Sequence, residues 1–314
     1  MTSDDLPMHE SMSQFRYGDR ERGLARAAYK AFEPYHLVAY FGPHVTSTYE
    51  RLGCGWRAGY AGLRGSALGA VPGAVVAATF FNFNPAAIER AWDSALEKHS
   101  VEDLNAARAH CVNVGLRDAL GDRVDDPALA DAARRMREVI STASVAGRPL
   151  ASAYAALPRP PEPHLQLWQD TTLWREWRGD GHIAALTLAG VDPLESLVLY
   201  DAELRSQPSS VTDGRGRVAM QPSRKWDDEA WDATVERLAA RKLVSAGADG
   251  NALLTEDGAA LRQRIEDQTD DAAGSVWVGV TDADAEALFA AVRPFVKMVI
   301  DAGFLPGTSR KNRS

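Results

Sequence analysis

The stretch from Trp174 to His182 concentrates more polar chemistry than any other part of this chain of 314 residues. Its order is Trp-Arg-Glu-Trp-Arg-Gly-Asp-Gly-His. We expect the two glycines to turn the backbone between two helices and Asp180 to cap the second helix. Arg178 and His182 would then lie beside a helix N-terminus, which attracts anions and carboxylate ligands. In an enzyme, His182 would be the acid or base, Glu176 would orient it and Arg178 would stabilise negative charge.

A second constellation is Glu33-x-x-His36, whose spacing places a carboxylate and an imidazole on one helical face. Carboxylate-bridged di-iron bundles use this spacing, but they need a second copy and two further glutamates. Because we find only one copy, we predict no metal and no cofactor, and we expect His36 to be buried and bonded to a neighbour. The enzyme hypothesis gives His36 the acid or base role and Glu33 the orienting role.

Aromatic residues around Phe80-Phe81-Asn82-Phe83-Asn84 could be ordinary core. Next to the guanidinium of Arg64 and the two amides, they could equally line a pocket for a flat organic ligand. The ligand-binding residues that we predict are Tyr40, Arg64, Phe80, Phe81, Asn82, Asn84, Arg178, Asp180 and His182.

The composition is that of a globular protein, with 45% apolar and 25% charged residues. The net charge of −8 disfavours non-specific attraction to phosphate. Cys54 and Cys111 match no zinc or disulfide pattern, so we expect buried, reduced thiols. We find no membrane-spanning run, no signal peptide and no Walker, Rossmann, GxSxG or HExxH motif, and we expect a cytoplasmic protein.

The elements that must position these residues are mostly helices. Asn84-Pro85, Ser100 and Asp126-Pro127 each predict a helix start. Pro34 predicts a kink or restart in the first helix. The glycine-rich segment 53–73 predicts tight turns and close backbone approach, in preference to a long regular element. Residues 75–81 fit either a strand or a buried helix.

Pro158 to Pro163 forms the best boundary, because four prolines in six residues favour an extended spacer. The predicted divisions are a disordered tail at 1–18, a helical domain at 19–157, a linker at 158–163, a second domain at 164–305 and a basic tail at 306–314. Within the second domain we expect a loop at 205–225, a helix at 226–242, a hairpin turning at Asp249-Gly250, and long helices from Thr255 and Asp282.

The passage ERLAARKLV followed by DGNALLTEDGAALRQRIEDQTD resembles the winged-helix segment of MarR-like proteins. The whole chain resembles an uncharacterised actinobacterial family of helix-turn-helix domain-containing proteins, on EPYH at 33–36, TFFNFNP at 79–85 and REWRGDGH at 175–182. The resemblance implies a mainly α fold with a winged helix-turn-helix C-terminal domain, and the N-terminal domain could be a diverged tandem copy. It also allows pairing of the C-terminal helices in a homodimer.

Two functions stay open at this point. The first is a winged-helix protein that binds a small aromatic or carboxylate-bearing molecule between its domains, including a ligand-responsive transcriptional regulator. The second is an enzyme of specialised metabolism that uses histidine, arginine and glutamate in the same pocket. DNA is disfavoured as a partner because residues 227–236 are rich in Asp and Glu, although the basic loop at 205–225 could contact a phosphate backbone or form a lid. A base-excising DNA enzyme is suggested by architecture alone.

Overall fold

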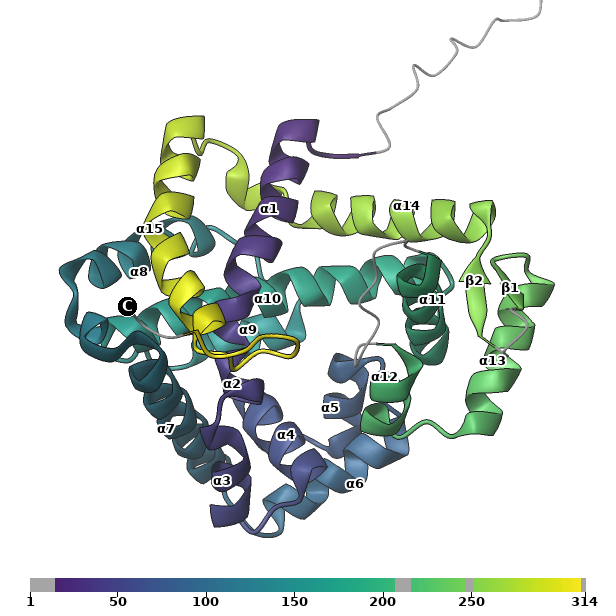
Figure 1. Cartoon of the computed structure of the whole chain (residues 1–314), viewed down its shortest axis with the longest axis horizontal. Helices are drawn as coiled ribbons and strands as arrows, with labels where there is room; N and C mark the ends of the chain where they lie inside the picture. The colour runs from purple at the N-terminus through teal and green to yellow at the C-terminus, as the bar shows by residue number, and fades with distance from the viewer. Residues whose placement is uncertain (1–14, 207–215, 247–250, 312–314) are drawn as a thin grey trace, which may run out of the picture.

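The computed structural model describes residues 15–206, 216–246 and 251–311, and this part of the chain is mainly helical (Figure 1). Its one sheet is the antiparallel pair β1 (Val244–Ala246) and β2 (Ala252–Leu254). The helices are α1 (Asp19–His36), α2 (Val38–Phe41), α3 (His44–Arg51), α4 (Trp56–Gly65), α5 (Gly73–Phe80), α6 (Pro85–Leu96), α7 (Val101–Leu120), α8 (Pro127–Ile140), α9 (Pro149–Ala156), α10 (Pro163–Leu188), α11 (Pro193–Ser206), α12 (Arg217–Arg224), α13 (Asp228–Ala240), α14 (Glu256–Ala272) and α15 (Asp282–Asp301).

The predicted helix starts at three positions are confirmed. The side chain of Asn84 accepts from Ala87 N, and that of Asp126 accepts from Ala128 N. Ser100 forms a complete capping box with Asp103. Residues 75–81, which fitted two interpretations, belong to helix α5 and its C-cap.

The predicted turn at Gly179-Asp180-Gly181 is wrong, because α10 runs without interruption from Pro163 to Leu188. A side chain at position 181 would collide with its neighbours: a Cβ there would lie 2.6 Å from Arg148 Nη1 and 3.3 Å from Ala272 Cβ. Gly181 therefore permits close packing and does not turn the chain. Figure 1 shows α10 crossing the middle of the molecule, with α1 and α14 against it.

Two expectations about the N-terminal region also need correction. α1 continues through Pro34 to His36, so the chain does not restart there; Pro34 lies in the last turn, where it removes one backbone hydrogen bond. The glycine-rich segment contains a helix, α4. Gly59 faces the ring of Tyr49 and Gly65 faces Trp92, and a Cβ at either position would lie 3.0 Å or less from those rings. These glycines therefore serve helix packing.

The largest apolar cluster joins α1, α5, α6, α7, α8, α10 and α15, and it contains residues from both sides of the proline-rich segment 158–163. A second cluster is formed mainly by α11, α13, β1, β2 and α14. Phe81, which follows α5, packs against this second cluster. The two clusters therefore meet where α5 approaches the C-terminal helices.

Three helices, α11, α12 and α13, precede the hairpin, and α14 follows it. The hairpin register pairs Val244 with Leu254 and Ser245 with Leu253. The segment predicted as a loop, 205–225, contains the end of α11 and all of α12, so that prediction is wrong for residues 205–206 and 217–224. Residues 207–215 and the expected Asp249-Gly250 turn lie outside the described residues. Cys54 and Cys111 are buried and free, as expected.

Across the described ranges, no single helix combines the length and the apolar composition of a membrane span. Two pairs of helices, each bent by about a right angle, reach these limits only when both members are counted together: residues 56–68 with 73–80, and 163–188 with 193–206.

Candidate ligand-binding site

A cavity of about 370 Å³ lies between the N-terminal helices α1, α4 and α5 and the C-terminal helices α10, α11, α12 and α14. Its volume is in the range of sites for small organic ligands. Its wall contains five arginines from four helices: Arg64, Arg175, Arg178, Arg224 and Arg262. We call this cavity the arginine pocket. Its acidic lining residues are Glu33, Glu176, Asp180 and Glu266.

One wall of the arginine pocket is a buried ion pair between α4 and α10. Arg64 donates from Nε and Nη2 to the two carboxylate oxygens of Glu176, at 3.0 and 2.8 Å. Arg175 donates to the same carboxylate at 2.6 Å. Burial opposes the ionisation of Glu176, but the charges of Arg175 and Arg64 outweigh it and hold the pKa of its carboxyl well below the usual value. The guanidinium of Arg64 also lies 4.3 Å from the centre of the Phe80 ring.

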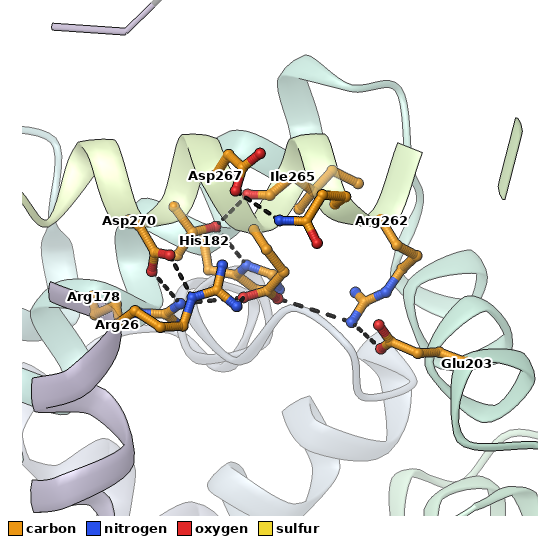
Figure 2. Close-up of polar contacts among 11 residues, drawn as sticks. Arg26, Arg178, His182, Glu203, Arg262, Ile265, Asp267 and Asp270 are labelled. Carbon is orange, nitrogen blue, oxygen red and sulfur yellow. Dashed lines mark hydrogen bonds and ion pairs between the residues drawn. The ribbon is translucent and has the colours of Figure 1, made fainter. Parts of the chain in front are cut away.

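A second wall joins α10 to α14, as Figure 2 shows. Arg178 Nη2 donates to Asp270 at 2.9 Å and to Glu266 at 3.2 Å. Arg262 donates to Glu203 of α11 at 2.7 Å and lies 3.8 Å from Glu266. The carboxylate of Glu266 is therefore shared between two arginines of the pocket.

Arg224 differs from the other four arginines. Within the described part of the chain, no carboxylate forms an ion pair with it; its Nη1 donates to Ser223 Oγ at 2.8 Å, and its guanidinium lies 5.1 Å from the Phe83 ring centre. Its Nε is buried without a hydrogen-bond partner in the same part of the chain. Burial without a counterion lowers the pKa of Arg224, so an anion beside it would be favoured.

The end of α12 is held against the turn that follows α5. Asn84 N donates to Arg224 O at 2.9 Å, and Trp226 Nε1 donates to Asn82 O at 3.0 Å. In this turn Phe81 has φ of 54° and ψ of −71°, and Asn82 N donates to Phe80 O at 2.8 Å. This is the rarer, strained kind of γ-turn. It places Phe81 in the lining of the pocket.

Aromatic rings form much of the remaining wall. Tyr60 stacks on Phe83 with centroids 5.4 Å apart, and Trp56 stacks on Tyr60 at 5.6 Å. Phe80 meets Tyr60 edge-on at 5.8 Å. Such faces fit a planar ligand, since aromatic rings gain from offset stacking and edge contacts.

Burial changes the protonation of several groups at the pocket. It raises the pKa of the Glu33 carboxyl, and it raises the pKa of Asp180 to about 6. It lowers the pKa of His182 to about 4, so this imidazole is neutral at pH 7. The lining itself contains five arginines against four carboxyl groups, which gives it an excess of positive charge.

The structure brings most of the predicted site residues together. The pocket lining includes Glu33, Arg64, Phe80, Phe81, Asn82, Glu176, Arg178, Asp180 and His182. Three predicted residues, His36, Tyr40 and Asn84, lie outside this lining. Asn84 caps α6, and the ring of Tyr40 packs against His36 and Tyr60.

His36 is fully buried and does not line the pocket. Its Nδ1 lies 2.9 Å from Thr172 Oγ1, and burial lowers the pKa of its ring to about 3. The sequence therefore places Glu33 and His36 on one helix, but only Glu33 lines the pocket. Among the described residues, no group of three or more His, Cys, Asp or Glu side chains could hold a metal ion.

Several pocket residues were missed by the sequence analysis. Arg262 and Glu266 have the spacing of an ordinary surface ion pair on a helix, and Arg224 was assigned to a basic loop. Tyr29 and Tyr200 also line the pocket and were not among the predicted site residues. Only the contact of α14 and α12 with α10 and α5 could show that these side chains share a cavity.

Asp180 caps a helix, but not the one predicted. Its carboxylate accepts from Ala151 N, at the start of α9, at 2.9 Å. We expect Asp180→Asn to stabilise the protein above about pH 6, because the buried carboxyl then need not ionise. The folded-state pKa is raised, so the wild type is penalised as pH rises from about 4 to about 6, by about 3 kcal/mol at most.

Urea unfolding of both proteins across this pH range measures the difference. Asp267→Asn is the matched control, since Asp267 accepts from Gln263 of its own helix and does not line the pocket. An Asp180→Asn variant whose advantage did not grow between pH 4 and 6 would contradict the prediction.

The fold and the pocket define a mainly helical protein in which a unit of three helices, a hairpin and a fourth helix closes one side of a ligand-sized cavity. A family model described as "Helix-turn-helix family" matches residues 25–306, and the chain belongs to that family. The match spans every residue that lines the arginine pocket. No curated protein and no solved structure matches the chain. The comparisons therefore give no support to the enzyme alternative.

Proposed function

We propose that this helix-turn-helix protein binds a small aromatic anion in the arginine pocket. The observation that carries the proposal is Arg224, a largely buried guanidinium that has no carboxylate partner among the described residues and lies over Phe83. A carboxylate, sulfonate or phosphate of the ligand would supply the missing counterion. The ring of the ligand would pack against the aromatic wall formed by Tyr60, Phe80 and Phe83.

Unpartnered donors at the same cavity support this proposal. The Nε atoms of Arg178, Arg224 and Arg262 are all buried without a hydrogen-bond partner in the described residues, and all three arginines line the pocket. Buried donors of this kind are costly unless they are satisfied. A bound anion, alone or with ordered water, would lower that cost by drawing the guanidinium groups toward it.

Anilinonaphthalene sulfonate is a suitable first probe because it is a fluorescent aromatic anion. Phenylnaphthylamine has the same ring skeleton without the sulfonate. We expect the anion to bind the wild type, and Arg224→Gln to weaken it about tenfold to hundredfold, the range for losing a charge-assisted hydrogen bond. Binding of phenylnaphthylamine should change little. Fluorescence titration measures both affinities.

Arg217→Gln is the matched control for the arginine substitution. Arg217 also belongs to α12, but it is paired with Asp228 at 3.0 Å and Asp232 at 2.8 Å and does not line the pocket. It should leave both affinities unchanged. Equal losses for the anion and the neutral probe, or equal effects of the two substitutions, would rule out Arg224 as the anion anchor.

The family description favours a second role, in which the protein is a cytoplasmic regulator that binds DNA. We propose that α11 to α14 form a MarR-like winged helix, with α13 in the place of the recognition helix. The exposed side of α13 carries Asp228, Glu229, Asp232 and Glu236. Arg237 of α13 pairs with Asp192, which lies just before α11, and Arg241, which follows α13, pairs with Glu195 of α11, each at 3.0 Å. DNA contact would therefore require these pairs to separate.

A gel-shift assay with the DNA upstream of the protein's own coding region, at low salt, tests this role. A shift that the aromatic anion reverses would support a ligand-responsive regulator. Absence of a shift would remove DNA binding from the proposal and leave the ligand site as it stands.

A further inference from the structure

Glu266 occupies an unusual position in the arginine pocket. It lines the cavity, and its carboxylate lies 3.2 Å from Arg178 and 3.8 Å from Arg262, with Arg26 of α1 at 3.6 Å. Burial opposes the ionisation of this carboxyl, but the neighbouring side chains, His182, Arg178 and Arg262 foremost, hold its pKa below the usual value. The protein's own side chain thus stands where an acidic group of a ligand would otherwise bind.

The two arginines do not need Glu266 as their sole counterion. Arg178 also donates to Asp270 at 2.9 Å, and its guanidinium lies 4.3 Å from the centre of the Tyr29 ring. Arg262 also donates to Glu203 at 2.7 Å. Figure 2 shows Asp270 beside Arg178 and Glu203 beside Arg262. If Glu266 lost its charge, Asp270 and Glu203 would still hold the two arginines in place. The part of their positive charge that Glu266 now neutralises would become available to a ligand.

We propose that Glu266 sets the selectivity of the pocket: it fills a second anion position, formed by Arg178 and Arg262, and so restricts the site to ligands that carry a single acidic group. The inference rests on the proposed function, because it assumes that a first acidic group binds at Arg224. Arg224 belongs to α12, whereas the second position is formed by α10 and α14.

The argument is one of charge repulsion inside a partly buried site. A ligand with two acidic groups would bring its second group toward a carboxylate that is already ionised, and like charges repel more strongly there than in water. A ligand with one acidic group would present an apolar end to the same region. Selectivity of this kind comes from a repulsive element against the wrong ligand, with no added attraction to the right one.

Competition against bound anilinonaphthalene sulfonate tests the inference. The competitors are naphthalene monosulfonate and a set of naphthalene disulfonates whose two groups stand at different separations, since sulfonates keep their charge at any working pH. For the wild type we expect the monosulfonate to compete better than every disulfonate. For Glu266→Gln we expect at least one disulfonate to gain tenfold or more relative to the monosulfonate.

Two further variants keep the result interpretable. Asp267→Asn removes the same charge one residue along α14, from a side chain that does not line the pocket, and it should leave the selectivity unchanged. Glu266→Asp keeps the charge and should keep the preference for a single acidic group. If Glu266→Gln strengthens both competitors equally, or neither, the selectivity role is overturned.

Different results would refute the proposed ligand site and the proposed role of Glu266. If the wild type does not bind the aromatic anion at all, or binds it independently of Arg224, the ligand site itself is wrong. If binding depends on Arg224 but the selectivity is the same with and without the Glu266 charge, only the role of Glu266 is lost.

Discussion

Replacing Glu176 by Gln is expected to lower the free energy of unfolding by about 3 to 5 kcal/mol, the usual result of removing one partner from a buried ion pair. The carboxylate of Glu176 is 1% exposed and accepts from both Arg64 and Arg175. Its loss would leave two guanidinium groups close together. Arg175 would keep its longer contact with Glu33, at 3.7 Å. Arg64 would keep the Tyr60 hydroxyl as its hydrogen-bond partner among the described residues, at 3.1 Å.

Urea unfolding at pH 7 measures the effect. Glu138→Gln removes the same kind of carboxylate from an ion pair of similar length, with Arg134 at 2.6 Å, but both side chains are more than half exposed. We expect this control to leave the unfolding midpoint almost unchanged, because solvent screens exposed pairs. Similar behaviour of the two variants would mean that the wall between α4 and α10 does not depend on its buried charges.

Helix starts could be predicted from the sequence because their determinants are local. Asn84, Ser100 and Asp126 each bond to a backbone N–H two or three residues away, so a window of a few residues contains the whole interaction. The mainly helical fold follows from the same local patterns. Prediction from local patterns is unreliable where the residues allow two backbone conformations and a contact with a distant part of the chain decides between them.

The passage around Gly181 illustrates that limit. Two glycines in three residues are compatible with a turn or with a helix that packs closely, and each glycine costs a helix about 1 kcal/mol. The deciding contacts come from Arg148 and Ala272, far away in the sequence. Asp180 likewise caps a helix, but that helix is α9, which precedes it in the chain. The residue types indicated close packing and helix capping, but the sequence did not show which distant residues take part.

The residues of the arginine pocket likewise fall into those with a local sequence signal and those without one. Arg64, Phe80, Asn82 and Arg178 stood out because they combine charge or amides with aromatic or glycine neighbours, and all of them line the cavity. Arg262 and Glu266 have the spacing of a common surface pair, so their burial against α10 had no sequence signal. A site built between helices that are far apart in the chain can be only half predicted from one sequence.

Gly258→Ala is expected to destabilise the protein by about 3 kcal/mol, although the same change usually stabilises a helix. Gly258 lies in the first turn of α14, where its N donates to the Thr255 cap at 3.1 Å. A Cβ at this position would lie 1.9 Å from the carbonyl oxygen of Leu243, which comes directly before β1. That oxygen also accepts from Thr255 N at 3.2 Å, so relief of the clash would break the contact that holds the hairpin to α14.

For Gly23→Ala, the same chemical change, we expect the opposite effect on stability. Gly23 is exposed in α1, and no neighbouring atom would lie within 4 Å of an added Cβ. Its replacement should raise the free energy of unfolding by about 0.5 to 1 kcal/mol, because alanine loses less backbone entropy in a helix. Urea unfolding of both variants tests the pair. If Gly258→Ala is neutral or stabilising, the hairpin is free to move away from α14, and the close packing of Leu243 on that helix does not hold the hairpin in place.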